Sequence, residues 1–336
     1  MKAMILAAGY GTRLRPVTYT IPKPVVPLCG QPLIAWAVES LLAYGIRDFV
    51  VNLHHLPEPI ERFLRERYRE SRFAFSYEPE ILGTGGGVRK VRKLLENESG
   101  FFLVNGDTVQ FPPYDALRAA RNDALAALML RHPPQGDHFT PVFFDDDRIT
   151  GFGKGNGQAL MFSGAHLISN RIFDYLPDKD FSGIVDEVYQ PLIDSGRETI
   201  AGVVDDGLWF DIGTPGRYMS ASRTMLDLTV RGQLAAARGT HVSGHSLIHD
   251  TGRVVGTISR SIVGERSVIE GRLTDSVVWD DCHIAKGVVL ESCVVAHGVE
   301  ITAPVALRNV LICRDDEAIP RQGQHRFEHG HVLHDI

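Results

Sequence analysis

A short pattern repeats four times in the last third of the chain, and it constrains the fold more than any other feature. Each repeat has an apolar pair, four mostly polar residues, and an apolar residue six positions after the second of the pair. The repeats span 262–269, 277–284, 294–301 and 312–319, so their starts lie 15, 17 and 18 residues apart. Such units cannot bury their apolar faces singly, but stacked units form a continuous core. The pattern favours a parallel β-helix over an antiparallel meander, because the tight Asn-Gly and Asp-Gly turns of a meander are absent here.

The first two thirds of the chain alternate strand-like and helix-like stretches. Strands are expected at 2–6, 48–53, 73–77, 101–104, 124–130, 159–167 and 199–204, and helices at 32–44, 57–68 and 184–195. This alternation is typical of a parallel or mixed sheet covered by helices on both faces. Ligands bind such folds at the carboxyl ends of the strands. We expect an α/β domain at 1–235, the β-helix at 240–320, and a tail at 321–336 that is a loose terminus or a subunit contact.

Composition limits the partners of these domains. The formal net charge of −6 provides no basic field for a nucleic acid. No apolar stretch reaches the roughly 18 residues that a membrane helix needs, and the first apolar run is too short for a signal peptide. The four cysteines lack CxxC spacing, so neither a zinc site nor a disulfide framework is expected. We expect a reduced, cytoplasmic protein that binds neither nucleic acid nor membrane.

The stretch GYGTRLRPVTYTIPKP follows the first expected strand and has the chemistry of a phosphate site. Gly9 and Gly11 let backbone N–H groups approach a phosphate without a Cβ in the way. Arg13 offers a planar fork of donors that suits phosphate oxygens. Two prolines restrict the backbone around Lys23, so that this cation has less entropy to lose on binding. A glycine-rich stretch alone would more often be only a turn. Together with Arg13 and Lys23, it predicts a site for a nucleoside triphosphate.

Two aspartates follow strand-like stretches in the same manner. Asp107 comes after FFLVNG and Asp211 after LWF, so each carboxylate is expected at the carboxyl end of a strand. Two such carboxylates could hold Mg²⁺, a hard cation that prefers oxygen ligands and keeps several waters. An aspartate in this position more often only caps a turn, and the residues alone leave both interpretations open.

The opening stretch resembles the signature of sugar-1-phosphate nucleotidyltransferases, the nucleotide-sugar pyrophosphorylases. The likeness extends through LGTGGG at 82–87, NGDT at 105–108, FSGAH at 162–166 and WFDIGTP at 209–215. A left-handed β-helix after the catalytic domain also occurs in that superfamily, so the resemblance covers nearly the whole chain. It implies a Rossmann-like mixed-sheet nucleotidyltransferase domain followed by a short left-handed parallel β-helix. The implied substrates are an NTP and a sugar 1-phosphate, which give an NDP-sugar and pyrophosphate.

The resemblance assigns roles residue by residue. Asp107 and Asp211 match the family's two metal-binding aspartates and imply Mg²⁺ as the cofactor. Arg13 would stabilise the leaving pyrophosphate, and Lys23 the α-phosphate as charge builds. The implied nucleotide-binding residues are Leu6, Ala7, Ala8, Gly9, Gly11, Thr12, Arg13, Gly83 and Thr84. No nucleophile or general base is required, because a sugar phosphate is already anionic at pH 7.

The sugar side of the site is less well defined. Gly164 matches the backbone that approaches the sugar. Lys154 lies where the family commonly has an EKP motif, whose lysine meets the sugar phosphate. Here Gly153 replaces the glutamate that commonly bonds sugar hydroxyls, which leaves the identity of the sugar open. Without the family, Lys154 would be interpreted as a solvated loop residue.

Glu78 lies five residues before Gly83, near the expected base pocket. Guanine presents N1–H and N2–H₂ side by side, and a carboxylate can accept from both, whereas uracil and thymine present one donor there and adenine has no N1–H. If Glu78 or Glu80 points inward, GTP is favoured, whereas a side chain that points to solvent gives no indication of the base. We therefore predict guanylyl transfer to mannose 1-phosphate or a related hexose or heptose phosphate.

Three alternatives remain open. One is uridylyl transfer from UTP to an N-acetylhexosamine, muramate or glucose 1-phosphate. Another is a non-catalytic homologue that senses nucleotide-sugars. A third is acyl transfer by the β-helix, with His283 or His297 as base. A homo-oligomer formed through the β-helix is also expected, because an apolar open end invites pairing or capping.

Overall fold

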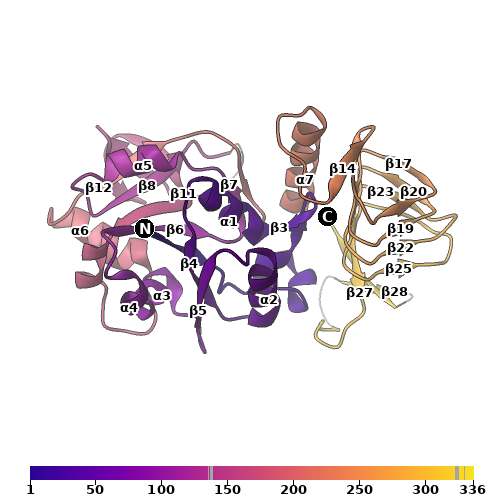
Figure 1. Cartoon of the computed structure of the whole chain (residues 1–336), viewed down its shortest axis with the longest axis horizontal. Helices are drawn as coiled ribbons and strands as arrows, with labels where there is room; N and C mark the ends of the chain where they lie inside the picture. The colour runs from indigo at the N-terminus through magenta and orange to yellow at the C-terminus, as the bar shows by residue number, and fades with distance from the viewer. Residues whose placement is uncertain (135, 137–138, 322–324, 329) are drawn as a thin grey trace. The chain divides into compact units, whose positions relative to one another are not determined.

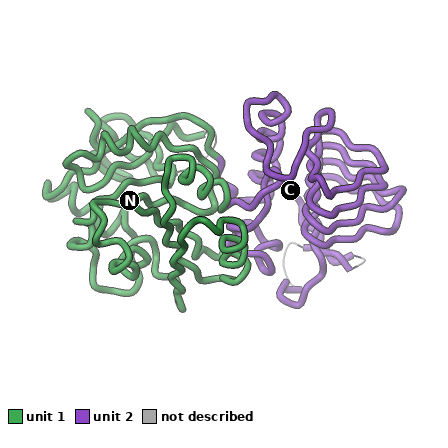
Figure 2. Tube along the Cα trace, viewed as in Figure 1, with its two compact units in different colours: residues 1–10, 34–209 green, residues 11–33, 210–336 purple. Residues whose placement is uncertain are grey.

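The computed structural model describes residues 1–134, 136, 139–321, 325–328 and 330–336. The chain divides into two compact units, coloured green and purple in Figure 2. Unit 1 is Met1–Tyr10 with Ile34–Trp209, and unit 2 is Gly11–Leu33 with Phe210–Ile336. The stretch that carries Arg13 and Lys23 therefore belongs to the same unit as the β-helix, which the sequence did not indicate.

Unit 1 is built on a nine-stranded mixed sheet with the order β5-β4-β1-β6-β11-β8-β12-β10-β9 (Figure 1). Strands β5, β4, β1 and β6 are parallel, and β11 runs antiparallel to both β6 and β8. The strands of the unit are β1 (Lys2–Leu6), β4 (Asp48–Leu53), β5 (Arg72–Tyr77), β6 (Gly100–Asn105), β7 (Thr108–Gln110), β8 (Ala126–Arg131), β9 (Val142–Asp145), β10 (Arg148–Phe152), β11 (Gln158–Ser169) and β12 (Ile200–Val204). The expected alternation of strands and helices is confirmed.

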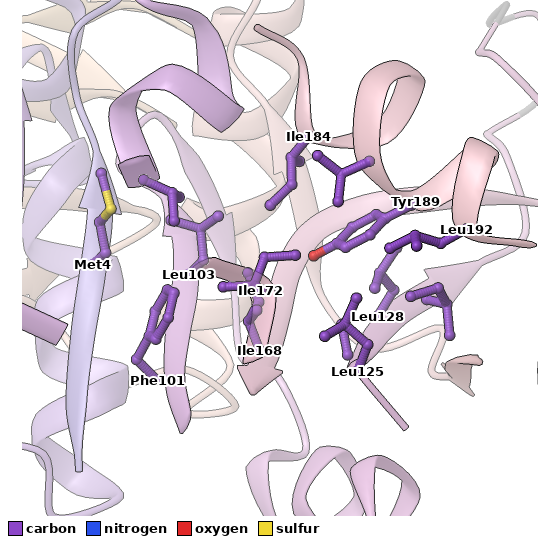
Figure 3. Close-up of a cluster of buried hydrophobic side chains, with 14 of the residues drawn as sticks. Met4, Phe101, Leu103, Leu125, Leu128, Ile168, Ile172, Ile184, Tyr189 and Leu192 are labelled. Carbon is purple, nitrogen blue, oxygen red and sulfur yellow. The ribbon is translucent and has the colours of Figure 1, made fainter. Parts of the chain in front are cut away.

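Helices cover both faces of this sheet. Successive side chains of a strand point to opposite faces, so neighbouring residues of one strand contact different helices. On one face, Met4 and Leu103 belong to the same buried cluster as Tyr189 (Figure 3). On the other face, the ring of Phe102 lies 5.7 Å from that of Tyr44 and 4.9 Å from that of Tyr114. The helices are α1 (Leu33–Ala43), α2 (Pro57–Arg67), α3 (Gly83–Lys90), α4 (Arg92–Leu95), α5 (Tyr114–Arg121), the 3-10 helix η4 (Asn170–Asp174), the π-helix η5 (Val185–Tyr189) and α6 (Gln190–Asp194). In place of the single helix expected at 184–195, the structure has the π-helix η5, which continues as α6.

Unit 2 contains a parallel β-helix with three faces. The first face is β15 (Ser246–His249), β18 (Ile262–Val263), β21 (Val277–Val278), β24 (Val294–Val295) and β27 (Val310–Arg314). The second is β16 (Arg253–Val254), β19 (Val268–Ile269), β22 (His283–Ile284) and β25 (Glu300–Ile301), and the third is β17 (Thr257–Ser259), β20 (Arg272–Thr274), β23 (Val289–Glu291) and β26 (Ala306–Arg308). Val263, Val278 and Val295 fill its interior. The β-helix that the repeats predict is confirmed.

The fourth predicted repeat is wrong in register. Val294 pairs with Leu311, so the aligned apolar pair begins one residue earlier than expected. Residues 318–319 form no strand. Instead the chain turns there and returns as β28 (Arg326–Glu328) and β29 (His331–Asp335), which runs antiparallel to β27. The expectation of a loose terminus is therefore also wrong for the described part of the tail, because backbone pairing satisfies the outer edge of β27.

The rest of unit 2 is one helix and a set of short turns. Helix α7 (Pro215–Val230), which the sequence analysis did not predict, is capped by the side chain of Thr214. The turns are η1 (Thr12–Leu14), η2 (Val17–Tyr19) and η3 (Lys23–Val25), and the short strands are β2 (Pro27–Leu28), β3 (Gln31–Pro32), β13 (Trp209–Asp211) and β14 (Thr240–Ser243). None of the described helices has the length and apolar character needed to cross a membrane.

Candidate active site

Gly11 shapes the glycine-rich turn after β1. Its φ of +62° lies in the left-handed region, and a Cβ there would lie 3.0 Å from the Cβ of Lys23. The carbonyl oxygen of Gly11 accepts the Leu14 N–H at 2.9 Å and the Thr18 hydroxyl at 2.8 Å. Glycine is therefore required both by the backbone conformation and by the close approach of Lys23.

Asp211 lies at the centre of a cluster of cations in unit 2. Its Oδ2 is 2.5 Å from Nη1 of Arg217 and 3.7 Å from Nη2 of Arg13, and its Oδ1 is 3.8 Å from Nζ of Lys23. The side chain of Lys23 is 7% exposed, whereas that of Arg13 is 63% exposed. A neighbouring carboxylate offsets part of the cost of removing an ammonium from water. The cluster thus holds three cations around a single carboxylate: Lys23 is sheltered, Arg217 is partly exposed and Arg13 is solvent-accessible.

The WFDIGTP motif builds this cluster locally. A Cβ on Gly213 would lie 2.8 Å from Nη1 of Arg13, so glycine leaves room for the guanidinium. The side chain of Thr214 accepts the N–H of Arg217 at 3.2 Å, and Pro215 begins α7, where its fixed φ suits the first turn. Arg217 is a site residue that the sequence analysis missed. The feature that could have identified Arg217 is its position in the first turn of the helix that follows Asp211.

A second network joins the carboxyl ends of three parallel strands in unit 1. After β1, the N–H of Ala7 donates to Oδ1 of Asn52 at 2.9 Å. Asn52, in β4, donates through Nδ2 to Oε1 of Glu78 at 2.8 Å. Glu78, after β5, accepts the N–H of Leu82 at 3.0 Å, just before the glycine-rich start of α3. Asn52 was missed by the sequence analysis, although a polar residue in the otherwise apolar run FVVNL is a usable signal.

Glu78 points inward, which is the condition under which the sequence favours GTP. Its side chain is buried, and each of its two oxygens already accepts one N–H from the protein. A carboxylate oxygen can accept more than one hydrogen bond, so guanine would have to share these oxygens with Asn52 and Leu82. Reading of the base by Glu78 therefore remains a prediction.

The glycines of LGTGGG leave room for the backbone of residues 182–184. A Cβ on Gly83 would lie 2.5 Å from the carbonyl oxygen of Ser182, and φ at Gly83 is +71°. The N–H of Gly85 donates to the same oxygen at 2.8 Å. Thr84, an exposed residue, accepts the N–H of Ile184 at 2.9 Å. The motif therefore fixes residues 182–184 beside the start of α3, and the expected contacts of Gly83 and Thr84 with a base remain predictions.

The NGDT and FSGAH motifs support each other within unit 1. Gly164 has φ +97°, and a Cβ there would lie 2.4 Å from Nδ2 of Asn105. The N–H of Gly106 donates to the carbonyl oxygen of Leu6 at 2.9 Å, which ties the NGDT turn to the end of β1. Asp107 is half-buried in this turn, directly after β6. Gly164 is thus required by the position of Asn105, two residues before Asp107.

The remaining expected site residues differ in their exposure to solvent. Ala7 and Ala8 are buried at the end of β1, Leu6 is half-buried, and Gly9 and Thr12 are exposed. Lys154 is exposed in the loop between β10 and β11. Of the four expected catalytic residues, the structure brings Arg13, Lys23 and Asp211 together in unit 2, and Asp107 belongs to unit 1.

Three histidines have polar partners within the fold. Burial lowers the pKa of His166 to about 3, and its Nδ1 lies 3.0 Å from the hydroxyl of Tyr189. In the β-helix, Nε2 of His283 faces Glu270 at 3.1 Å and Nδ1 of His297 faces Asp281 at 3.6 Å. Among the described residues, no group of three or more His, Cys, Asp or Glu side chains is placed to hold a metal ion by itself.

A mixed α/β sheet unit with Glu78 and Asp107 after its strands, and a second unit with a cation cluster around Asp211 and a parallel β-helix, together indicate a class of nucleotide-handling enzymes. The chain belongs to the nucleotidyl transferase family, whose family model matches residues 2–227. A second model, described as GlmU-like, C-terminal hexapeptide, matches residues 244–323. The predicted membership of the sugar-1-phosphate nucleotidyltransferases and the left-handed β-helix are confirmed.

Curated relatives extend over most of the chain. A probable mannose-1-phosphate guanylyltransferase 1 of Oryza sativa is 32% identical over 75% of this chain and 72% of its own length. A probable mannose-1-phosphate guanylyltransferase 3 of the same plant is 29% identical over 93% of this chain and 86% of its own. A UTP–glucose-1-phosphate uridylyltransferase of Synechocystis is 31% identical over 69% and 65%, respectively. The crystal structure of HddC from Yersinia pseudotuberculosis complexed with GMP-PN matches with a TM-score of 0.57 and 24% identity, over 67% of this chain and 99% of that chain, which supports the fold.

Proposed function

We propose that this protein transfers a guanylyl group from GTP to a mannose-like hexose or heptose 1-phosphate and releases pyrophosphate. The observation that carries the proposal is the cluster in which Arg13, Lys23 and Arg217 surround Asp211. Such a cluster suits a reaction between two polyanions, whose main obstacle is charge repulsion.

In the proposed reaction, a phosphate oxygen of the sugar 1-phosphate attacks the α-phosphorus of GTP. A new P–O bond forms while the bond from the α-phosphorus to the oxygen of the leaving pyrophosphate breaks. Lys23, sheltered from water, stabilises charge on the α-phosphate in the transition state. Arg13, exposed at the glycine-rich turn, binds the β- and γ-phosphates and the departing pyrophosphate.

Asp107 and Asp211 are the proposed ligands of Mg²⁺. The donor set fits this ion, because Mg²⁺ is usually bound through one or two carboxylates plus substrate phosphates rather than by a cage of protein ligands. When bound, Mg²⁺ would neutralise phosphate charge. Asp211 contacts Arg13 and Lys23 in this structure, and these two cations would bind phosphate oxygens of the substrates.

The choice of base and sugar rests on the names of the relatives. Several are named mannose-1-phosphate guanylyltransferases, among them proteins of Oryza sativa, Eremothecium gossypii and Arabidopsis thaliana. The inward direction of Glu78 supports GTP as well. The relative named as a UTP–glucose-1-phosphate uridylyltransferase supports uridylyl transfer as the second candidate.

We propose the remaining roles from the same likeness. The nucleotide would contact Leu6, Ala7, Ala8, Gly9, Gly11, Thr12, Arg13, Glu78, Gly83 and Thr84. The sugar phosphate would contact Lys154 and Gly164. The β-helix would mediate a homo-oligomer, and the enzyme would act in the cytoplasm.

A pyrophosphate-release panel tests the proposal. ATP, GTP, CTP, UTP and dTTP are each combined with mannose, glucose, N-acetylglucosamine, muramate and heptose 1-phosphates in the presence of Mg²⁺. We expect the fastest release with GTP and mannose or heptose 1-phosphate. Faster release with UTP would replace the guanylyl proposal by the uridylyl one, and no release with any pair would favour a nucleotide-sugar sensor.

A further inference from the structure

One face of the β-helix is apolar on both of its sides. In the first face, five side chains point into the interior, those of Ile248, Val263, Val278, Val295 and Ile312. Their preceding neighbours point outward on the same strands because side chains alternate. These outward residues are also buried, and they are Leu247, Ile262, Val277, Val294 and Leu311. This explains why the repeats carry apolar pairs: the first residue of each pair packs against other parts of unit 2.

This face is covered by α7 and by the segment Gly11–Leu33, here called the loop, which carries Arg13 and Lys23. A small apolar cavity within unit 2 is lined by Leu14 from the loop, Tyr218 from α7, and Trp279 and Val294 from the β-helix. Leu14 directly follows Arg13, and Tyr218 directly follows Arg217. The neighbours of two cations of the Asp211 cluster therefore pack on the β-helix itself.

Two buried hydrogen bonds extend this contact to the third cation. The indole Nε1–H of Trp279 donates to the hydroxyl oxygen of Tyr218 at 2.7 Å. The Tyr218 hydroxyl donates in turn to the carbonyl oxygen of Pro27 at 2.7 Å. Tyr218 and Trp279 are 2% and 3% exposed. Because the Pro27 carbonyl lies four residues after Lys23, the chain of bonds runs from the β-helix to the backbone that carries Lys23.

We propose that Tyr218, held by Trp279 of the β-helix, is a positioning residue that keeps Arg13, Lys23 and Arg217 around Asp211. The β-helix thereby contributes to catalysis within its own chain, in addition to any role in assembly. This inference rests on the proposed function for its kinetic consequence, but its structural consequence can be measured without turnover.

The primary test is Tyr218→Phe, which keeps the ring and removes both hydrogen bonds. Its matched control is Thr229→Val. This change removes another buried hydroxyl of α7, one that bonds only to the Met225 carbonyl of the same helix among the contacts described. Hydrogen exchange is followed at three amides of the loop, those of Leu14, Val25 and Val26, whose acceptors are loop carbonyls. We expect exchange at these amides to be about tenfold faster in Tyr218→Phe and unchanged in Thr229→Val.

Kinetics add a readout that loss of stability alone would not change. Well below the unfolding temperature, kcat of Tyr218→Phe is expected to fall about tenfold while KM for the sugar 1-phosphate stays within about twofold, because Lys23 acts mainly in the transition state. Trp279→Phe keeps the phenol and should shift exchange in the same direction by a smaller factor.

Unchanged loop exchange in Tyr218→Phe and Trp279→Phe would overturn the inference. So would equal acceleration throughout unit 2 in Tyr218→Phe and Thr229→Val, because that result would indicate general destabilisation. If the wild-type enzyme released no pyrophosphate with any substrate pair, the proposed function would fail, whereas the exchange result would still decide the positioning role.

Discussion

Lys23 and Asp211 face each other in unit 2 with 3.8 Å between Nζ and Oδ1, and their side chains are only 7% and 15% exposed. Two charges so sheltered from water interact more strongly than a surface pair. In the proposed reaction, a phosphoryl oxygen would take the place of this carboxylate beside the Lys23 ammonium.

The first prediction concerns this lysine. Lys23→Gln removes the charge at a similar side-chain length, and we expect kcat to fall by about 100-fold to 1000-fold, the usual effect of losing one charge-stabilising donor. The control is Lys93→Gln on α4, which removes an exposed lysine. Pyrophosphate release measures both variants. Retention of more than about half of wild-type kcat in Lys23→Gln would show that this cation does not act on the reacting phosphate.

The second prediction concerns the glycine of FSGAH. In Gly164→Ala, the new Cβ meets Asn105 at 2.4 Å and the backbone keeps φ +97°, so we expect both strain and displacement of the NGDT turn. Gly45→Ala is a matched control, because φ there is +98° and nothing lies within 4 Å of the added Cβ. Thermal unfolding should show destabilisation of about 1–3 kcal/mol from strain in the control and more in Gly164→Ala. Activity should be lost only in Gly164→Ala. Equal activity in the two variants would show that the position of Asn105 does not matter for activity.

Much of this architecture could be predicted from the sequence because apolar patterning is local. The strand ends carry the motifs, and the β-helix repeats mark which residues enter its core. The register of the fourth repeat could not be predicted, since Leu311, Ile312 and Cys313 are all apolar and only pairing with β24 decides among them. The strands of the tail were missed because they are stabilised by pairing with β27 rather than by a periodic pattern of their own.

The candidate site was predictable to the extent that its residues lie in motifs. Asn52 was missed because its partner Glu78 lies 26 residues away in the sequence. Arg217 was missed because it lies just beyond the WFDIGTP motif, six residues after Asp211. The assignment of the Arg13 and Lys23 stretch to unit 2 also depends on tertiary packing, through Tyr218 and Pro27. No local pattern reports such contacts.

The third prediction concerns the buried carboxylate of Glu78. Glu78→Gln places an amide NH₂ against one of two N–H donors, those of Asn52 and Leu82. We expect destabilisation of about 1–3 kcal/mol, because one buried donor loses its acceptor. If Glu78 also reads the base, the ratio of kcat/KM for GTP to that for UTP should fall. An unchanged ratio with a lowered unfolding temperature would make Glu78 a support of the strand ends only.

The fourth prediction follows from the low pKa of His166. Burial lowers this pKa to about 3, so the folded protein holds the imidazole neutral, whereas the unfolded chain binds a proton below about pH 6.5. The unfolding free energy should therefore fall by up to about 1.4 kcal/mol per pH unit as the pH drops below 6.5 toward 3. In His166→Gln this contribution disappears. Denaturant titrations between pH 7 and 4.5 would contradict the account if both proteins showed the same slope.

The proposed transfer depends on Mg²⁺ and on the carboxylates of Asp107 and Asp211, its proposed ligands. Its most direct test is pyrophosphate release by Asp107→Asn and Asp211→Asn, with Asp146→Asn as a control at an exposed position. We expect the wild type and the control to release pyrophosphate only when GTP, the sugar 1-phosphate and Mg²⁺ are all present, and each active-site variant to lose release with every substrate pair. Substantial release by Asp107→Asn or Asp211→Asn, in a folded protein, would contradict the claim.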